Sequence, residues 1–119
     1  MISYLAAPYS SIHIHIRDRR YNQISFVASE LMKRGEIIYS PITACHHIAA
    51  DYSLPFDADY WLRTNLEFLT HCGKLYVLQL DGWEQSIGVK REIEFATERN
   101  IPIEYITLGD FSDQDNRHK

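Results

Sequence analysis

The chain has 119 residues, of which 45% are hydrophobic and 24% are charged, and its formal net charge is −4. This length is typical of one domain with one sizeable core, and this composition is typical of a soluble globular protein. The acidic balance argues against a general nucleic-acid-binding surface, which needs a basic excess to neutralise phosphates. The charge does not exclude binding of a small phosphorylated ligand, because one or two local hydrogen-bond donors are enough to bind it.

The sequence shows no sign of a membrane segment or of a disulfide framework. No apolar run has the length needed to span a bilayer, and the N-terminal stretch lacks the basic lead of a signal peptide. The two cysteines, Cys45 and Cys72, are expected to be reduced thiols. We therefore expect a cytoplasmic protein that associates with neither a membrane nor a nucleic-acid polymer.

Short apolar runs alternate with helical patterns in the first half of the chain. Residues 2–7 are an apolar and aromatic run that ends at a proline, which predicts a buried strand. A loop follows, and apolar positions within 17–34 recur with helical spacing before Gly35, a good helix stop. A second short strand is expected at 36–41, closed by Pro41, and then a short helix and a loop within 42–57.

The second half continues this alternation. A helix with an apolar stripe is expected at 59–70, and 74–80 is the strongest strand signal of the chain. A helix at 86–100 and a last strand at 101–108 follow. The residues from Gly109 to the end are polar and are expected to form a frayed tail, 109–119.

Strands that are separated by helices imply right-handed crossovers and a mostly parallel sheet that is covered on both faces. We therefore predict one α/β domain over residues 1–108, a three-layer Rossmann/flavodoxin-like fold with four to five strands. In such sheets ligands bind beyond the carboxyl ends of the strands, near the point where the strand order reverses. This rule selects the loop "APYSS" after the first strand and the loop "DGWEQS" (81–86) after the strand at 74–80.

The start of the helix at 86–100 carries two unusual residues. Ser86 is a plausible N-cap, and Gly88 stands in the first turn, where a glycine costs helix stability. A simple capped turn explains both residues. The other interpretation is that a ligand approaches the free amides of the helix start, which favour anions.

Glu92 is the candidate for chemistry within this helix. It follows Gly88 by one turn, so its side chain leans back toward the helix start, beside the inward apolar stripe. A carboxylate in this place is a candidate nucleophile or base, and the alternative is a surface ion pair with a neighbouring Arg or Lys. Glu94 and Glu98 point elsewhere and are expected to be solvated.

The histidine-rich stretches "HIH" (13–15) and "CHH" (45–47) do not have the spacing of a metal site, because adjacent histidines on a helix point in different directions. No metal or cofactor is therefore expected. A cysteine nucleophile is not favoured either, since no base stands at a matching spacing.

Three stretches together resemble the nucleoside 2-deoxyribosyltransferase superfamily, which includes the deoxynucleoside 5′-monophosphate N-glycosidases. They are "YLAAPYS" (4–10), "NLEFLTHCGKLYVL" (65–78) and "SIGVKREIEFA" (86–96), and the third has the Ser/Asp-x-Gly-x-x-x-Glu pattern of a helix start in that superfamily. The likeness is greatest to a small uncharacterised branch. It implies an enzyme that cleaves or transfers the N-glycosidic bond of a nucleoside or its 5′-monophosphate.

The resemblance also implies roles for single residues. Glu92 falls at the position of the nucleophilic glutamate, which would form a glycosyl-enzyme ester, and Tyr4 at the position of the tyrosine that orients it. Ser86, Gly88 and Ser10 would bind the sugar-phosphate end. Further substrate-binding candidates are Asp81 and Trp83 in the second loop.

Asn65 departs from the superfamily pattern, which commonly has Asp at its position. An amide cannot act as an acid or base, but it can donate a hydrogen bond to Glu92 and so position it. A catalytically silent nucleotide-binding or sensing module is therefore the alternative function. Members of the superfamily are typically homodimers or larger, and the aromatic residues Trp83, Tyr60 and Trp61, together with the stretch "YSLPF" (52–56), agree with a homo-oligomer.

Overall fold

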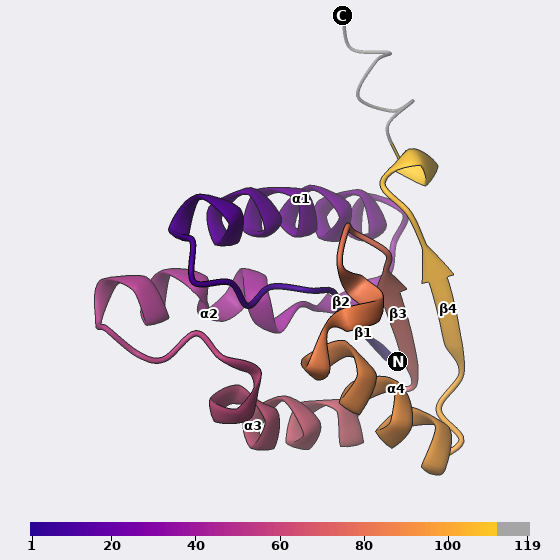
Figure 1. Ribbon diagram of the computed structural model, residues 1–119. Coiled ribbons are helices and arrows are strands. Elements are labelled where there is room, and N and C mark those ends of the chain that lie inside the picture. The colour runs from indigo at the N-terminus through magenta and orange to yellow at the C-terminus, as the bar shows by residue number, and fades with distance from the viewer. Residues whose placement is uncertain (112–119) are drawn as a thin grey trace, which may run out of the picture.

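The computed structural model describes residues 1–111 and contains four parallel strands in one sheet, as predicted (Figure 1). The strands are β1 (Ile2–Ala6), β2 (Ile37–Tyr39), β3 (Lys74–Leu78) and β4 (Ile103–Ile106). Their order in the sheet is β2-β1-β3-β4, so the chain first adds a strand on one side of β1 and then on the other. The order reverses between β1 and β3, which is where ligands bind in sheets of this kind.

Both faces of the sheet are buried, which explains why the strands are continuous apolar runs. Successive side chains of β1 alternate between the faces, so that Leu5 joins one core cluster while Tyr4 and Ala6 join the other. β3 divides in the same way, with Leu78 on the first face and Val77 on the second.

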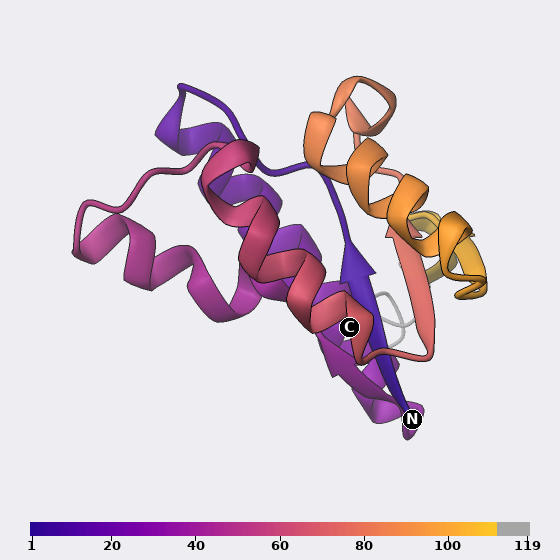
Figure 2. The same cartoon turned by 90° about the horizontal axis from the view of Figure 1, so that it is seen from below.

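Helices cover the two faces and complete the three layers. One face is covered by α1 (Ile14–Lys33), and the other by α3 (Ala58–Thr70) and α4 (Ile87–Glu98), as Figure 1 shows. Figure 2 shows α3 and α4 side by side against their face of the sheet. The remaining α-helix of the described residues, α2 (Pro41–Asp51), packs against α1, and a short 3-10 helix, η1 (Trp83–Gln85), precedes α4. The observed architecture is the predicted α/β fold.

For α1 the sequence predicted the stop more accurately than the start. Gly35 has a φ of 91°, and its N–H bonds to the Met32 carbonyl while the Glu36 N–H bonds to that of Leu31. This is a Schellman stop, which the glycine permits because it has no Cβ. The start was wrong by three residues, because the alternating "HIHI" stretch hides the first turn of α1, where Ile14 is half exposed.

Pro41 begins α2 as well as following β2. Ser40 is the N-cap, and its side chain accepts a hydrogen bond from the Thr43 N–H. A proline is well tolerated at the first helical position, because its missing N–H would have no partner inside the helix. The loop and the helix expected within 42–57 are both present, with the helix first.

The predicted tail begins later than Gly109. Phe111 is buried in the core cluster on the α1 face, and the Arg34 guanidinium lies 4.6 Å from the centre of its ring. An aromatic side chain of this size stabilises the fold by apolar burial. The rest of the predicted tail, 112–119, lies outside the described residues. No helix within residues 1–111 combines the length and the apolar character that crossing a bilayer requires.

Candidate active site

A cavity of about 680 Å³, including its open mouth, lies at the carboxyl end of the sheet. It is bounded by the loop after β1, by α2, and by the N-terminal halves of α3 and α4. Five of the eight predicted site residues line it: Ser10, Asn65, Ser86, Gly88 and Glu92. The cavity therefore lies at the switch point of the sheet and brings together segments that are far apart in the sequence.

Glu92 and Tyr4 form a buried hydrogen-bonded pair beneath this cavity. The Tyr4 hydroxyl donates to Glu92 Oε2, although the two residues are 88 positions apart in the chain. Tyr4 is fully buried, because β1 is a central strand, and Glu92 is 5% exposed within the inward stripe of α4. The tyrosine hydroxyl is thus a direct hydrogen-bond partner of the carboxylate at the cavity.

The surroundings of Glu92 exclude the surface ion pair that the sequence left open. The carboxylate is buried, and none of the ion pairs found among residues 1–111 includes it. Burial raises its pKa to about 7, while the hydrogen bond from Tyr4 acts in the opposite direction. A carboxyl group with this pKa is partly ionised near neutral pH, which suits a nucleophile or an acid–base group.

Tyr4 is suited to the role of a permanent donor. Its pKa is raised well above the usual value, first because of burial and then because of the Glu92 charge. The phenol therefore stays protonated throughout the physiological range. Tyr39 packs against it with ring centres 5.9 Å apart, which restricts the ring and with it the hydroxyl.

The start of α4 has the cap that the sequence predicts. Ser86 is the N-cap, and its Oγ accepts a hydrogen bond of 3.2 Å from the Val89 N–H. The first free amides of the helix, with their partial positive charge, lie beside the cavity at Gly88. Ser86 can still donate its hydroxyl proton to a ligand.

Gly88 is not required by close packing. A Cβ added there would lie 3.4 Å from the Ala58 Cβ, which is an ordinary van der Waals contact. We expect Gly88→Ala to raise the free energy of unfolding by about 0.5 kcal/mol, because alanine favours the helix. The same methyl group narrows the cavity, so ligand affinity should fall. Denaturant unfolding and ligand titration measure the two effects, and a stable variant with unchanged affinity would remove Gly88 from the site.

Asn65 and Ser10 both line the cavity. Asn65 lies half-buried on α3, and the structure describes no hydrogen bond from its amide to Glu92, which the sequence led us to expect. The Ser10 hydroxyl donates to the Phe56 carbonyl at 2.9 Å. Both side chains line the cavity, but neither is a direct partner of the carboxylate.

Asp81 and Trp83 do not line the cavity, although the loop that carries them ends at it. Asp81 is exposed, and its backbone carbonyl accepts a hydrogen bond from Arg20. Trp83 packs against the α4 face of the core and against Tyr105, with ring centres 5.8 Å apart. The tight turn at Gly82, where φ is 89°, directs this loop over Arg20 instead of into the cavity.

Three polar residues at the cavity were missed by the sequence analysis: Tyr9, His46 and Asp57. Tyr9 belongs to the selected loop "APYSS", and His46 to the "CHH" stretch, which we weighed only as a metal ligand. The inward position of His46 on α2 was the available signal, since Pro41, His46 and Ala49 form its buried side.

Cysteine and metal chemistry find no support among residues 1–111. No group of three or more His, Cys, Asp or Glu side chains in this part of the chain is placed to hold a metal ion. Cys45 lines the cavity, but burial raises the pKa of its thiol, which disfavours the nucleophilic thiolate.

The chain matches a known family over nearly the whole of the described fold. The family model for a domain of unknown function (DUF1937) covers residues 1–107, which include all the residues that line the cavity. No curated protein matches the chain. The α/β domain with its buried Tyr4–Glu92 pair therefore belongs to the DUF1937 family.

Proposed function

We propose that this protein cleaves or transfers the N-glycosidic bond of a nucleoside or a nucleoside 5′-monophosphate, with Glu92 as the nucleophile. The observation that carries the proposal is the buried Glu92 carboxylate, which lines an open cavity, has no cationic partner among residues 1–111 and accepts a hydrogen bond from Tyr4. The resemblance to the nucleoside 2-deoxyribosyltransferase superfamily supports it, because the same two positions carry the nucleophile and its orienting tyrosine there.

The proposed chemistry follows from the environment of the carboxylate. Ionised Glu92 attacks C1′ of the sugar, the base departs, and a glycosyl-enzyme ester forms. Water or a second base then releases the sugar. A carboxylate that is poorly solvated and held by one hydrogen bond is more nucleophilic than one in water, and the hydrogen bond from Tyr4 holds this carboxylate at the cavity.

The assay that tests this proposal is the release of free base. Purified protein is incubated with a panel of ribonucleosides, deoxynucleosides and their 5′-monophosphates, and the products are separated by chromatography. Turnover of at least one substrate, abolished in Glu92→Gln, is the expected result. No base release and no base exchange across the panel would contradict the proposal.

A 5′-phosphate is the group that the start of α4 is best suited to bind. The Ser86 hydroxyl and the free amides near Gly88 lie at the cavity, and a helix N-terminus favours anions. We expect a nucleoside monophosphate to bind more tightly than its nucleoside by over about tenfold, since hydrogen bonds to a charged group contribute roughly 1.5–3 kcal/mol. Calorimetry with both ligands measures this, and equal affinities would assign the site to free nucleosides.

A catalytically silent nucleotide-binding or sensing module is the second candidate. The amide of Asn65 at the cavity favours it, because this position cannot supply an acid proton. Such a module would bind nucleotides with the same affinity in wild type and in Glu92→Gln and would release no base from either.

We also propose that the protein is a homodimer or a larger homo-oligomer. Several aromatic and aliphatic side chains of α2, α3 and their connection are exposed: Ile48, Tyr52, Tyr60 and Phe68. Exposed large apolar side chains, where they gather into one patch, are typical of interfaces. Light scattering at tens of micromolar should give at least twice the 14.0 kDa chain mass, and a monomer mass would contradict the proposal.

A further inference from the structure

Three polar side chains form a continuous path from the surface of the protein into the candidate cavity. The Tyr9 hydroxyl lies 2.5 Å from His46 Nδ1, and His46 Nε2 lies 3.1 Å from Asp18 Oδ1. Tyr9 belongs to the loop after β1, His46 to α2 and Asp18 to α1. Tyr9 and His46 line the same cavity as Glu92, whereas the Asp18 side chain is 54% exposed. The path therefore joins solvent to the cavity through one imidazole.

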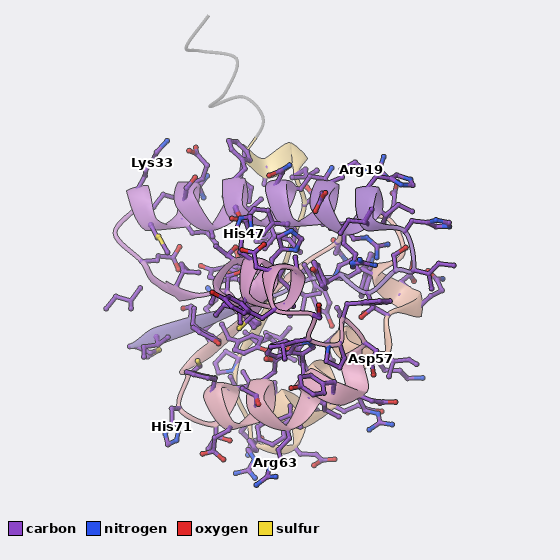
Figure 3. All side chains as sticks on the ribbon, turned by 90° about the vertical axis from the view of Figure 1, so that its left-hand side faces the viewer. Arg19, Lys33, His47, Asp57, Arg63 and His71 are labelled. Atoms are coloured by element: carbon purple, nitrogen blue, oxygen red, sulfur yellow. The ribbon has the colours of Figure 1, made fainter. Side chains whose placement is uncertain are left out.

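The imidazole is held in a fixed orientation. His46 is 5% exposed, and the ring of Tyr21 on α1 stacks on it at 4.4 Å with an interplanar angle of 20°. His47 contacts the same tyrosine edge-on, and Figure 3 shows His47 between the two helices. Nδ1 faces the Tyr9 hydroxyl and Nε2 faces Asp18, and a carboxylate beside Nε2 favours the neutral tautomer that carries its proton on Nε2.

The Tyr9–His46 hydrogen bond reverses when the imidazole gains a proton. In neutral His46, Nδ1 accepts the Tyr9 hydroxyl proton. In the imidazolium, Nδ1–H donates to the Tyr9 oxygen and leaves the phenolic proton free to point into the cavity. Tyr9 can thus either give a proton to a bound molecule or take one from it.

Cleavage of an N-glycosidic bond needs such a group, because the departing base carries away the electron pair of the bond. The Asn65 amide has no acid proton to supply. Asp57, the other carboxyl at this cavity, is exposed at the start of α3, away from His47 (Figure 3). Tyr9 lies in the cavity and has a buried proton source behind it.

We propose that Tyr9, His46 and Asp18 form the proton relay for the leaving base, an inference that rests on the proposed function. As the C1′–N bond breaks and Glu92 bonds to C1′, Tyr9 gives its proton to the base, and His46 Nδ1–H reprotonates the Tyr9 oxygen. When water later attacks C1′, Tyr9 takes its proton and passes its own to His46, while the Glu92 carboxylate leaves. The relay returns to its starting state.

The charges around the relay are compatible with this cycle. Burial raises the pKa of Tyr9, and the Asp18 charge acts in the same direction, while Arg17 lowers it. The phenol is therefore protonated near neutral pH and available as a donor. The groups that face His46 are Tyr9, Asp18, Tyr21 and His47, and the carboxylate of Asp18 lies 3.1 Å from its Nε2.

The experiment compares leaving groups that do and do not need a proton. The first set is the panel of nucleosides and 5′-monophosphates, and the second is 4-nitrophenyl 2-deoxyribofuranoside and its 5-phosphate, whose leaving group departs as a stable anion. Tyr9→Phe and His46→Gln should lose about 10²–10⁴-fold in kcat/KM on the first set and stay within about threefold on the second. His47→Gln is the matched control and should act like wild type on both.

Asp18→Asn gives an independent readout of the relay. The amide keeps the size of the side chain but removes the carboxylate that lies 3.1 Å from His46 Nε2, so kcat/KM should fall on the panel substrates as it does in His46→Gln. On the 4-nitrophenyl substrates Asp18→Asn should stay within about threefold of wild type. A merely structural role for Asp18 would lower activity on both sets of substrates alike.

The outcomes separate the relay from the proposed function. The relay is overturned if Tyr9→Phe and His46→Gln lose equal activity on both sets of substrates, or if Tyr9→Phe loses none. The proposed function still stands in that case, provided that Glu92→Gln is inactive on both sets. The relay is also overturned if Asp57→Asn loses activity only on the nucleoside panel while Tyr9→Phe stays active. Asp57 would then be the group that protonates the leaving base. If wild type cleaves neither set, the proposed function fails and the relay fails with it.

Discussion

Glu92→Gln should lower base release by about 10³-fold or more while folding and nucleotide binding survive. Glutamine keeps the size of the side chain and can accept the hydrogen bond from Tyr4, but it cannot form a glycosyl ester. In the wild type kcat/KM should rise with pH through about 7, because only ionised Glu92 attacks the sugar and burial raises its pKa to about 7. Chromatographic assays across this pH range measure both effects.

Glu94→Gln is the matched control for this experiment. Glu94 is on the same helix, two residues later, and is exposed to solvent. Its replacement should leave base release and its pH profile unchanged. In the wild type, a 2-fluoro-2-deoxy sugar analogue should label residue 92, which mass spectrometry detects. Full turnover by Glu92→Gln would overturn the nucleophile and leave the binding-module function.

Glu92 should also make the fold less stable as pH rises, and Glu92→Gln should remove this dependence. The pKa of the carboxyl is raised from 4.5 to about 7 by burial, so between these values the unfolded chain loses a proton that the folded chain keeps. This group therefore does not affect folding stability below the pKa of 4.5 that it has in the unfolded chain. Above that pH the stability falls as pH rises through the folded pKa of about 7. The total loss is about 3 kcal/mol, since each pKa unit corresponds to ~1.4 kcal/mol.

The difference between variant and wild type isolates this effect from all other titrating groups. Denaturant unfolding at pH 4.5 and pH 8 should show nearly equal stability at the lower pH and a Glu92→Gln variant that is more stable by about 3 kcal/mol at the higher pH. A difference that does not change with pH would mean that Glu92 titrates normally in the folded protein. The wild type would then not carry a destabilised carboxylate in its cavity.

Much of this protein is determined locally by its sequence. The alternation of apolar runs and helical patterns specified the strands, the helices and the parallel sheet, because each pattern records which faces of an element are buried. Gly35 and Ser86 marked a helix stop and a helix start by backbone chemistry that needs no tertiary contact. The inward lean of Glu92 followed from helical spacing alone.

Other features were decided only when distant segments met. Sequence spacing could not distinguish a buried Glu92 from a surface ion pair, because the answer depends on β1 placing Tyr4 beneath α4. Trp83 and Asp81 looked suitable for the site by position, but the turn at Gly82 leads them away from the cavity.

The Asp18–His46–Tyr9 path depends on tertiary structure even more strongly. Its members come from α1, α2 and a loop, and no local period relates them. Hydrophobic patterns along the chain indicate which face of its own helix or strand each residue occupies, since they arise from the geometry of that single element. The partner and the solvation of a polar group are set by packing between elements, and these decide the pKa and the chemistry of the group.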